Sequence, residues 1–171
     1  MLLIKIINFI LFQIGWVTAL YFNTWWSGLI CLLFAITNFR LLFLHSVPNL
    51  LIGCLIASLG MLNDALLIWH DVISIRSISS FPFWLAGLWL LFTSTFDGCL
   101  SWLNNKPLVL LSFGGAIGGA TSYYAGCKIG AINYHFWHLP DFVFFALNWA
   151  LLFPALFRLN SLLKAEFNPG S

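Results

Sequence analysis

The sequence predicts an all-α membrane protein built as a bundle of six transmembrane helices. Only 7% of its 171 residues are charged and 61% are hydrophobic, whereas about a quarter of the residues in a soluble domain are charged. The hydrophobic residues form continuous blocks of roughly twenty, the length that a helix needs to cross a bilayer core. A membrane β-barrel would instead show segments of about ten residues with alternating polarity. We expect one transmembrane domain over residues 1–164 and a short disordered tail over residues 165–171.

The six expected helices follow the hydrophobic blocks in order. They are Ile6–Phe22, Trp26–Leu44, Val47–Trp69, Phe81–Leu100, Leu108–Cys127 and Phe142–Leu156. We expect the first block to be a retained helix and not a cleaved signal peptide, because no small-x-small cleavage site follows it. Asn23 and Thr24, with Trp25 beside them, form a polar and aromatic turn that suits the headgroup level and separates the first two helices.

Prolines support the starts of the later helices, because a proline in the first turn of a helix costs no hydrogen bond. The prolines of this kind are Pro48, Pro82, Pro107 and Pro140. Two residues before three of them stand Ser46, Ser80 and Asn105, which are residue types that favour the N-cap position. The helix starts therefore agree with the hydrophobic blocks.

The seven cationic side chains predict the orientation of the bundle. If the N-terminus is cytoplasmic, five cations lie at or near cytoplasmic helix ends and two lie at the opposite ends. The five are Lys5, Arg40, Lys106, Arg158 and Lys164, and the two are Arg76 and Lys128. The positive-inside rule therefore predicts that both termini are cytoplasmic, an N-in/C-in topology.

Composition and spacing argue against nucleic acid, metal and cofactor binding. The net charge is only +2 and no Lys/Arg cluster is present, so no phosphate-binding surface is expected. The cysteines lie inside hydrophobic blocks without a C-x-x-C motif. His135, His138 and Asp141 have a ligand-like spacing, which His70 and Asp71 could complete. We favour the alternative, in which these histidines belong to an interfacial aromatic belt. We expect no metal and no cofactor.

The helix expected at Leu108–Cys127 carries a face of small residues. Four of them recur at intervals of four, namely Gly114, Gly118, Ser122 and Gly126. A face of this kind lets another helix approach closely in lipid. We expect it to pack against a helix of the bundle, or against a second copy or a partner membrane protein. The alternative is that the bare face lines a groove for a lipid tail.

An internal repeat is a further hypothesis. A shift of 59 residues aligns four pairs without gaps: Trp25 with Trp84, Gly28 with Gly87, Pro48 with Pro107 and Gly60 with Gly119. The second and third helices would then repeat as the fourth and fifth in the same orientation, as in some transporters. The alternative is chance matching, which is common in hydrophobic sequence.

Several short motifs resemble those of a known family. They are Asn8-Phe9, Phe12-Gln13-x-Gly15-Trp16, Pro82-x-Trp84-x3-Leu88-Trp89-x2-Phe92, Leu100-x-Trp102-Leu103 and the small-residue segment from Gly114 to Gly130. Together they resemble a bacterial inner-membrane family, domain of unknown function 2878, over essentially the whole chain. The resemblance implies a small multi-pass protein of the bacterial inner (cytoplasmic) membrane. It implies no activity, substrate or catalytic residue.

Ionisable residues inside membrane spans are the usual indicators of function. Asp64 is expected near the outer boundary, at the depth of four polar residues: Asn63, Ser122, Tyr123 and Asn148. We predict a ligand-binding site there. The alternative is a structural carboxyl group that hydrogen-bonds Tyr123 or Asn148, in the neutral form that burial favours.

A second polar layer is expected near the inner boundary. There we predict that Arg40 and Asp97 form a structural ion pair. At a rise of about 1.5 Å per residue, Asp64 and Asp97 differ in depth by roughly 15 to 20 Å. The two carboxyl groups are therefore too far apart to act as a catalytic pair.

Three functions remain open from the sequence. The first is the binding or translocation of a small molecule or lipid through the polar pocket around Asp64. The second is a small membrane-embedded enzyme, or an accessory subunit of lipid metabolism, with Asp64 acting beside His70 or Tyr123. The third is a structural subunit that holds a partner through the Leu108–Cys127 helix. Membrane lipids are expected as partners in each case.

Overall fold

The protein is all-α apart from one very short pair of strands. The computed structural model describes residues 2–43, 47–75, 82–134 and 139–167. The elements are α1 (Leu2–Phe22), α2 (Trp25–Phe43), α3 (Val47–Trp69), β1 (Ser74–Ile75), α4 (Phe83–Thr93), the 3-10 helix η1 (Ser101–Leu103), α5 (Leu108–Ile129), β2 (Ile132–Asn133) and α6 (Leu139–Phe167). Five helices, α1, α2, α3, α5 and α6, are long and apolar enough to cross a membrane. The predicted ends at Leu44 and Phe81, and residues 168–171 of the expected tail, lie outside the described residues.

The fourth helix is shorter than the sequence indicated. The hydrophobic block predicted a span to Leu100, but α4 has eleven residues and ends at Thr93. Three consecutive hydroxyl groups explain the stop. Thr93, Ser94 and Thr95 each donate a hydrogen bond to the carbonyl three residues earlier, and these bonds compete with the regular helical pattern. The chain then continues in turns to η1.

The sixth helix is longer than expected. It continues through the three residues from Ala165 to Phe167, which were predicted to lie in the disordered tail. Tertiary contacts stabilise the polar part of the helix that follows Leu156. Arg158 donates hydrogen bonds to the backbone carbonyls of Asn104 and Lys106, and Asn160 is buried. The hydrophobic block ends near Leu156, but the helix continues to make tertiary contacts beyond that residue.

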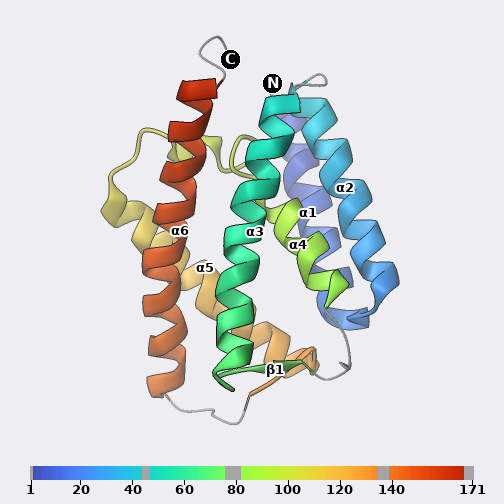
Figure 1. Ribbon diagram of the computed structural model, residues 1–171, viewed down its shortest axis with the longest axis vertical. Coiled ribbons are helices and arrows are strands. Elements are labelled where there is room, and N and C mark those ends of the chain that lie inside the picture. Colours follow the sequence, from blue (N-terminus) through green and yellow to red (C-terminus); the bar gives the residue numbers. More distant parts are fainter. Residues whose placement is uncertain (1, 44–46, 76–81, 135–138, 168–171) are drawn as a thin grey trace.

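The helices run alternately up and down, so that both described chain ends lie at the same end of the bundle (Figure 1). At the opposite end, the loops after α3 and α5 are joined by the antiparallel pair of β1 and β2. Ser74 lies opposite Asn133, and Ile75 lies opposite Ile132. This small ladder ties the C-terminal end of α3 to that of α5, the two helices that carry Asp64 and Tyr123.

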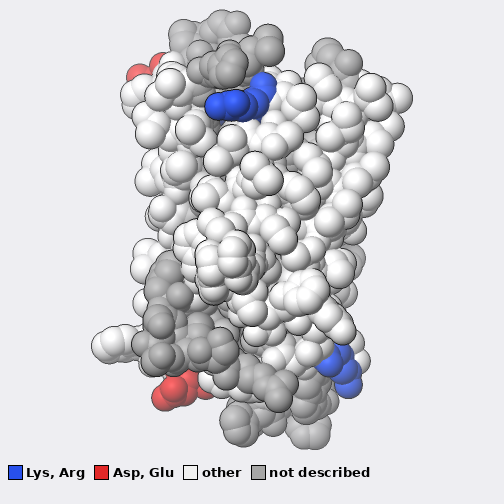
Figure 2. Space-filling model, turned by 90° about the vertical axis from the view of Figure 1, so that its right-hand side faces the viewer, with Lys and Arg blue, Asp and Glu red and all other residues white. Residues whose placement is uncertain are grey.

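Glycines allow the closest contacts in the interior. Gly28 of α2 and Gly87 of α4 face each other, and a Cβ on Gly87 would lie 2.5 Å from the carbonyl oxygen of Gly28. The outer surface is apolar, with large side chains such as Leu51 and Leu151 exposed. On the face drawn in Figure 2, the visible charged side chains lie near the two ends, with an uncharged belt between them. This arrangement is typical of a protein that spans a membrane.

Candidate ligand-binding groove

Asp64 lies at the meeting point of three helices. Its side chain, on α3, is buried and accepts hydrogen bonds from three donors. The Tyr123 hydroxyl group of α5 donates to Oδ1, and the Trp89 indole N–H of α4 donates to Oδ2 over 2.6 Å. Asn63 donates a longer bond of 3.4 Å to Oδ1. The described residues place no Lys or Arg in an ion pair with this carboxyl group.

The structure brings together part of the predicted outer layer. Asn63 and Tyr123 contact Asp64, whereas Ser122 and Asn148 make no hydrogen bond to it in the described chain. The Ser122 hydroxyl group instead accepts a bond of 2.9 Å from the indole N–H of Trp16. The Asn148 amide nitrogen is buried and has no hydrogen-bond partner among the described residues. His70, the other group considered for chemistry with Asp64, is exposed.

Trp89 was not predicted as a partner of Asp64. The signal that was available is chemical, because a buried indole N–H usually finds an acceptor. The layer predicted around Asp64 named residues of α3, α5 and α6 only. In the structure Trp89 of α4 reaches the same carboxyl group.

A cavity of about 870 Å³ lies beside Asp64, with walls from α1, α4 and α5. Helix α1 packs on α2 and α4, and α5 packs on α6, which leaves a space between α1 and α5. Most lining residues are apolar, and Asp64, Gln13 and Ser122 are among the polar exceptions. Phe113 and Ile117 line the cavity and are also exposed at the molecular surface. The cavity therefore opens sideways between α1 and α5, and we call the cavity with this opening the groove.

The predicted packing face of α5 is displaced by one residue. Among the described residues, no atom of another element would lie within 4 Å of a Cβ added to Gly114 or Gly118, and both glycines line the groove. The packing glycines are Gly115 and Gly119, which lie against Trp149 of α6. The prediction that Gly114 and Gly118 pack against another helix is therefore wrong within this chain. One residue of offset turns a helix face by about 100°.

The other two members of that face differ. Gly126 does pack closely, since its Cβ would lie 2.9 Å from the Ile132 side chain of β2. Ser122, through its bond with Trp16, links α5 to α1 across the groove. The small residues of α5 thus serve two surfaces: one holds α6 and the other leaves the groove open.

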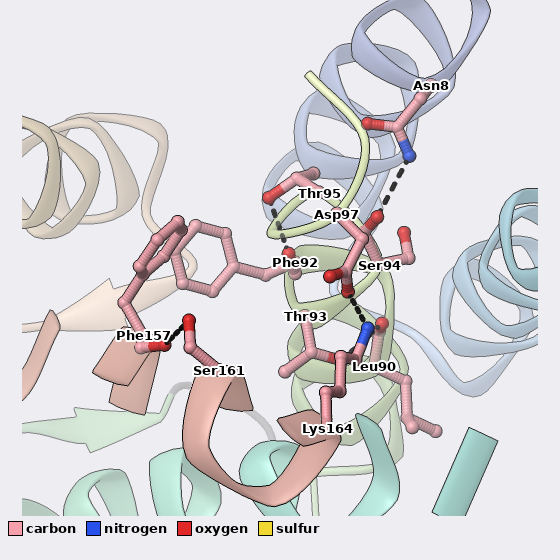
Figure 3. A network of polar contacts seen from close by, with 10 residues as sticks. All are labelled: Asn8, Leu90, Phe92, Thr93, Ser94, Thr95, Asp97, Phe157, Ser161 and Lys164. Atoms are coloured by element: carbon pink, nitrogen blue, oxygen red, sulfur yellow. Dashed lines mark hydrogen bonds and ion pairs between the residues drawn. The ribbon is translucent and has the colours of Figure 1, made fainter. Parts of the chain in front are cut away.

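The inner polar layer also differs from the prediction. Asp97 forms its ion pair with Lys164 of α6, and not with Arg40, which is exposed. Figure 3 shows Asp97 and Lys164 pointing toward each other beside the end of α4. The physical reason is the early end of α4 together with the extension of α6, neither of which the hydrophobic pattern revealed.

Asn8 of α1 stabilises the segment after α4. Its amide nitrogen donates to the carbonyl of Ser94 over 3.1 Å (Figure 3). Its amide oxygen accepts the backbone N–H of Cys99 over 3.0 Å. Gly98 permits this approach, because a Cβ there would overlap the Asn8 amide. Asn38 of α2 donates to the Ser94 hydroxyl group. In a membrane, backbone N–H and C=O groups that lie outside a regular helix need such hydrogen-bond partners.

A family comparison covers nearly all of this architecture. A family model described as a protein of unknown function (DUF2878) matches residues 5–155. The chain belongs to the DUF2878 family. No curated protein and no solved structure matches it. In this DUF2878 protein, the groove-lining residues from Phe12 to Phe153 fall inside the matched segment, whereas Lys164 falls beyond it.

Within the described residues of this DUF2878 protein, no group of three His, Cys, Asp or Glu side chains could hold a metal ion. The ligand-like spacing of His135 and His138 lies outside those residues. Asp141 at the start of α6 interacts with Tyr134. Burial, and then the charge of Asp141, raise the pKa of Tyr134 to about 12.

Proposed function

We propose that this DUF2878 protein binds an amphipathic lipid, with the polar end at Asp64 and the hydrocarbon portion in the groove. The observation that carries the proposal is the form of the groove. It ends at a buried carboxyl group, and it opens sideways at Gly114 and Gly118, where a Cβ would meet no atom of another described element within 4 Å. A ligand dissolved in the bilayer could enter there without crossing water.

The dimensions suit a hydrocarbon chain. The α5 residues that line the groove run from Leu110 to Ala125, which corresponds to about 22 Å of helix. The hydrocarbon core of a bilayer is about 30 Å thick, so a chain in the groove would cover most of that depth. A volume of about 870 Å³ falls within the roughly 300 to 1,000 Å³ of known ligand sites.

The test is the identity of the molecules that remain bound after purification. Native mass spectrometry of the full chain, released from detergent micelles, is expected to show a bound lipid. Gly118→Phe should remove it, because the new ring would fill the groove. Ala155→Phe is the matched control, since Ala155 of α6 is exposed and does not line the groove. Equal lipid retention in both variants would overturn the proposal.

The competing occupant of the groove is a helix from a second copy or from a partner protein, docked at Gly114 and Gly118. The same spectra distinguish the two. A protein bound at fixed stoichiometry, lost in Gly118→Phe and kept in Ala155→Phe, would replace the lipid proposal.

For the orientation we propose an N-in/C-in topology in the bacterial inner membrane. Lys106 and Arg158 lie together at the end of the bundle that carries the chain ends, and such cationic ends favour the cytoplasm. Asp64 would then lie toward the outer side. Reporter fusions at each terminus test this, and activity of a periplasmic reporter at either end would contradict it.

An enzymatic role in lipid metabolism is the second candidate, favoured by the hydrogen bond between Tyr123 and Asp64. A carboxyl group and a phenol in contact can pass a proton to a bound substrate. If this candidate holds, the lipid bound by Asp64→Asn should differ chemically from the lipid bound by the wild type. An identical bound lipid in both would leave binding or translocation as the role.

A further inference from the structure

Gln13 is a polar side chain in an unusual position. It lies near the middle of α1, it is exposed, and it lines the groove. Among the residues that the structure describes, no donor or acceptor forms a hydrogen bond with its amide. In hydrocarbon an amide without a partner is strongly unfavourable. A partner from outside the chain, bound in the groove, would remove that cost.

Asp64 has capacity for one further hydrogen bond. An ionised carboxylate accepts about four hydrogen bonds, and the structure shows three donors to Asp64. Tyr123 and Asn63 occupy Oδ1, whereas Trp89 alone occupies Oδ2. Because Asp64 also lines the groove, a ligand can supply the fourth donor, to Oδ2.

The relative depths of these two groups follow from the contacts. Trp16 bonds to Ser122, the neighbour of Tyr123, which in turn bonds to Asp64. Trp16 and Asp64 therefore lie at similar levels. Gln13 is three residues from Trp16 toward the middle of the bundle, a rise of about 4.5 Å. Beyond Gln13 the groove is lined by apolar residues such as Leu110 and Phe113.

We propose that the ligand is a lipid with a free hydroxyl group and an ester or amide carbonyl, as in a monoacylglycerol. The hydroxyl group donates to Asp64, and the Gln13 amide donates to the carbonyl about one helical turn deeper. The acyl chain then continues along Gly118 and Gly114. This proposal rests on the proposed function and adds the chemical class of the ligand.

Three probes of equal chain length test the class: a monoacylglycerol, a fatty-acid methyl ester and a long-chain alcohol. The methyl ester lacks the hydroxyl donor, and the alcohol lacks the carbonyl. Binding to the full chain in nanodiscs is expected to be at least about tenfold tighter for the monoacylglycerol, which corresponds to about 1.4 kcal/mol. Equal binding of the three probes would overturn the chemical class but keep the groove.

The variant Gln13→Leu links the preference to a residue. It should lower the affinity for the monoacylglycerol to that for the alcohol and leave the alcohol unchanged. Ser58→Leu is the matched control, because Ser58 is exposed on α3 outside the groove and bonds only to its own helix. An unchanged preference in Gln13→Leu would overturn the inference. If no probe binds and Gly118→Phe behaves as the wild type, the proposed function itself fails.

A stability measurement separates this role from a structural one. Without ligand, Gln13→Leu should raise the unfolding temperature in detergent, because it removes a polar group that has no partner. If the substitution lowers the unfolding temperature, Gln13 has a partner within the protein and the inference is wrong.

Discussion

The indole rings of Trp89 and Trp149 stack in parallel, with centroids 5.6 Å apart and planes 2° from parallel. They come from α4 and α6, and each lies against a glycine of another helix, Gly60 of α3 and Gly119 of α5 respectively. Trp89 also donates a hydrogen bond to Asp64. The wall of the groove that faces the bundle interior therefore depends on two tryptophans, each of which needs a glycine on the neighbouring helix.

The first prediction concerns these two glycines. A Cβ at Gly60 would overlap the ring of Trp89, and a Cβ at Gly119 would overlap the ring of Trp149. Gly60→Ala and Gly119→Ala should each destabilise the protein by about 1–3 kcal/mol, the usual cost of overpacking. Thermal unfolding in detergent measures this.

Gly118→Ala is the control on the same helix. It adds the same methyl group in open space, and alanine favours a helix over glycine by about 1 kcal/mol. It should therefore leave stability unchanged or raise it. A similar loss at Gly118 and Gly119 would contradict the assignment of the two faces.

The sequence was sufficient to predict the helical class and the contact between Asp64 and Tyr123. Continuous hydrophobic blocks require helices in lipid, because only a helix pairs its own backbone groups there. Depth along each helix then placed Asp64 and Tyr123 at one level. Gly60 and Gly119, which the 59-residue shift aligns, each pack against a tryptophan of another helix, but the internal repeat itself stays a hypothesis.

Other features needed tertiary information. Hydropathy is averaged over about twenty residues, so it does not register the three hydroxyl groups that end α4 at Thr93. The small-residue spacing of α5 does not specify which neighbouring glycines face α6. The partner of Asp97 depended on both the early end of α4 and the extension of α6 to Lys164.

The second prediction concerns the donors to Asp64. Tyr123→Phe and Trp89→Phe each remove one hydrogen bond to a buried carboxyl group. Each should cost about 1–3 kcal/mol of stability. The double variant should cost less than the sum, because the two donors share one acceptor group.

Unfolding of the single and double variants in detergent measures these values. Tyr21→Phe is the matched control, since Tyr21 is exposed and its ring contact with Phe22 does not need the hydroxyl group. Equal effects of Tyr21→Phe and Tyr123→Phe would show that the bond to Asp64 contributes nothing.

The third prediction concerns the support of the chain after α4. Asn8→Leu leaves the carbonyl of Ser94 and the N–H of Cys99 without their partner in the interior. At about 1–3 kcal/mol for each unsatisfied group, the loss should exceed that of most single substitutions. Proteolysis of the Ser94–Asn104 segment should accelerate. Phe9→Leu, at an exposed neighbouring position, should leave both stability and cleavage unchanged.

The last prediction tests which cation pairs with Asp97. Lys164→Met removes the partner from a carboxyl group whose side chain is only 18% exposed, and breaking a buried pair on one side typically costs about 3–5 kcal/mol. Adding Asp97→Leu to Lys164→Met should recover much of that stability, because no unpaired charge then remains. Arg40→Met should have little effect, since Arg40 is exposed and lies outside the pair. If Arg40→Met destabilises the protein as much as Lys164→Met, the pairing of Asp97 with Lys164 is not the interaction that holds this end of the bundle.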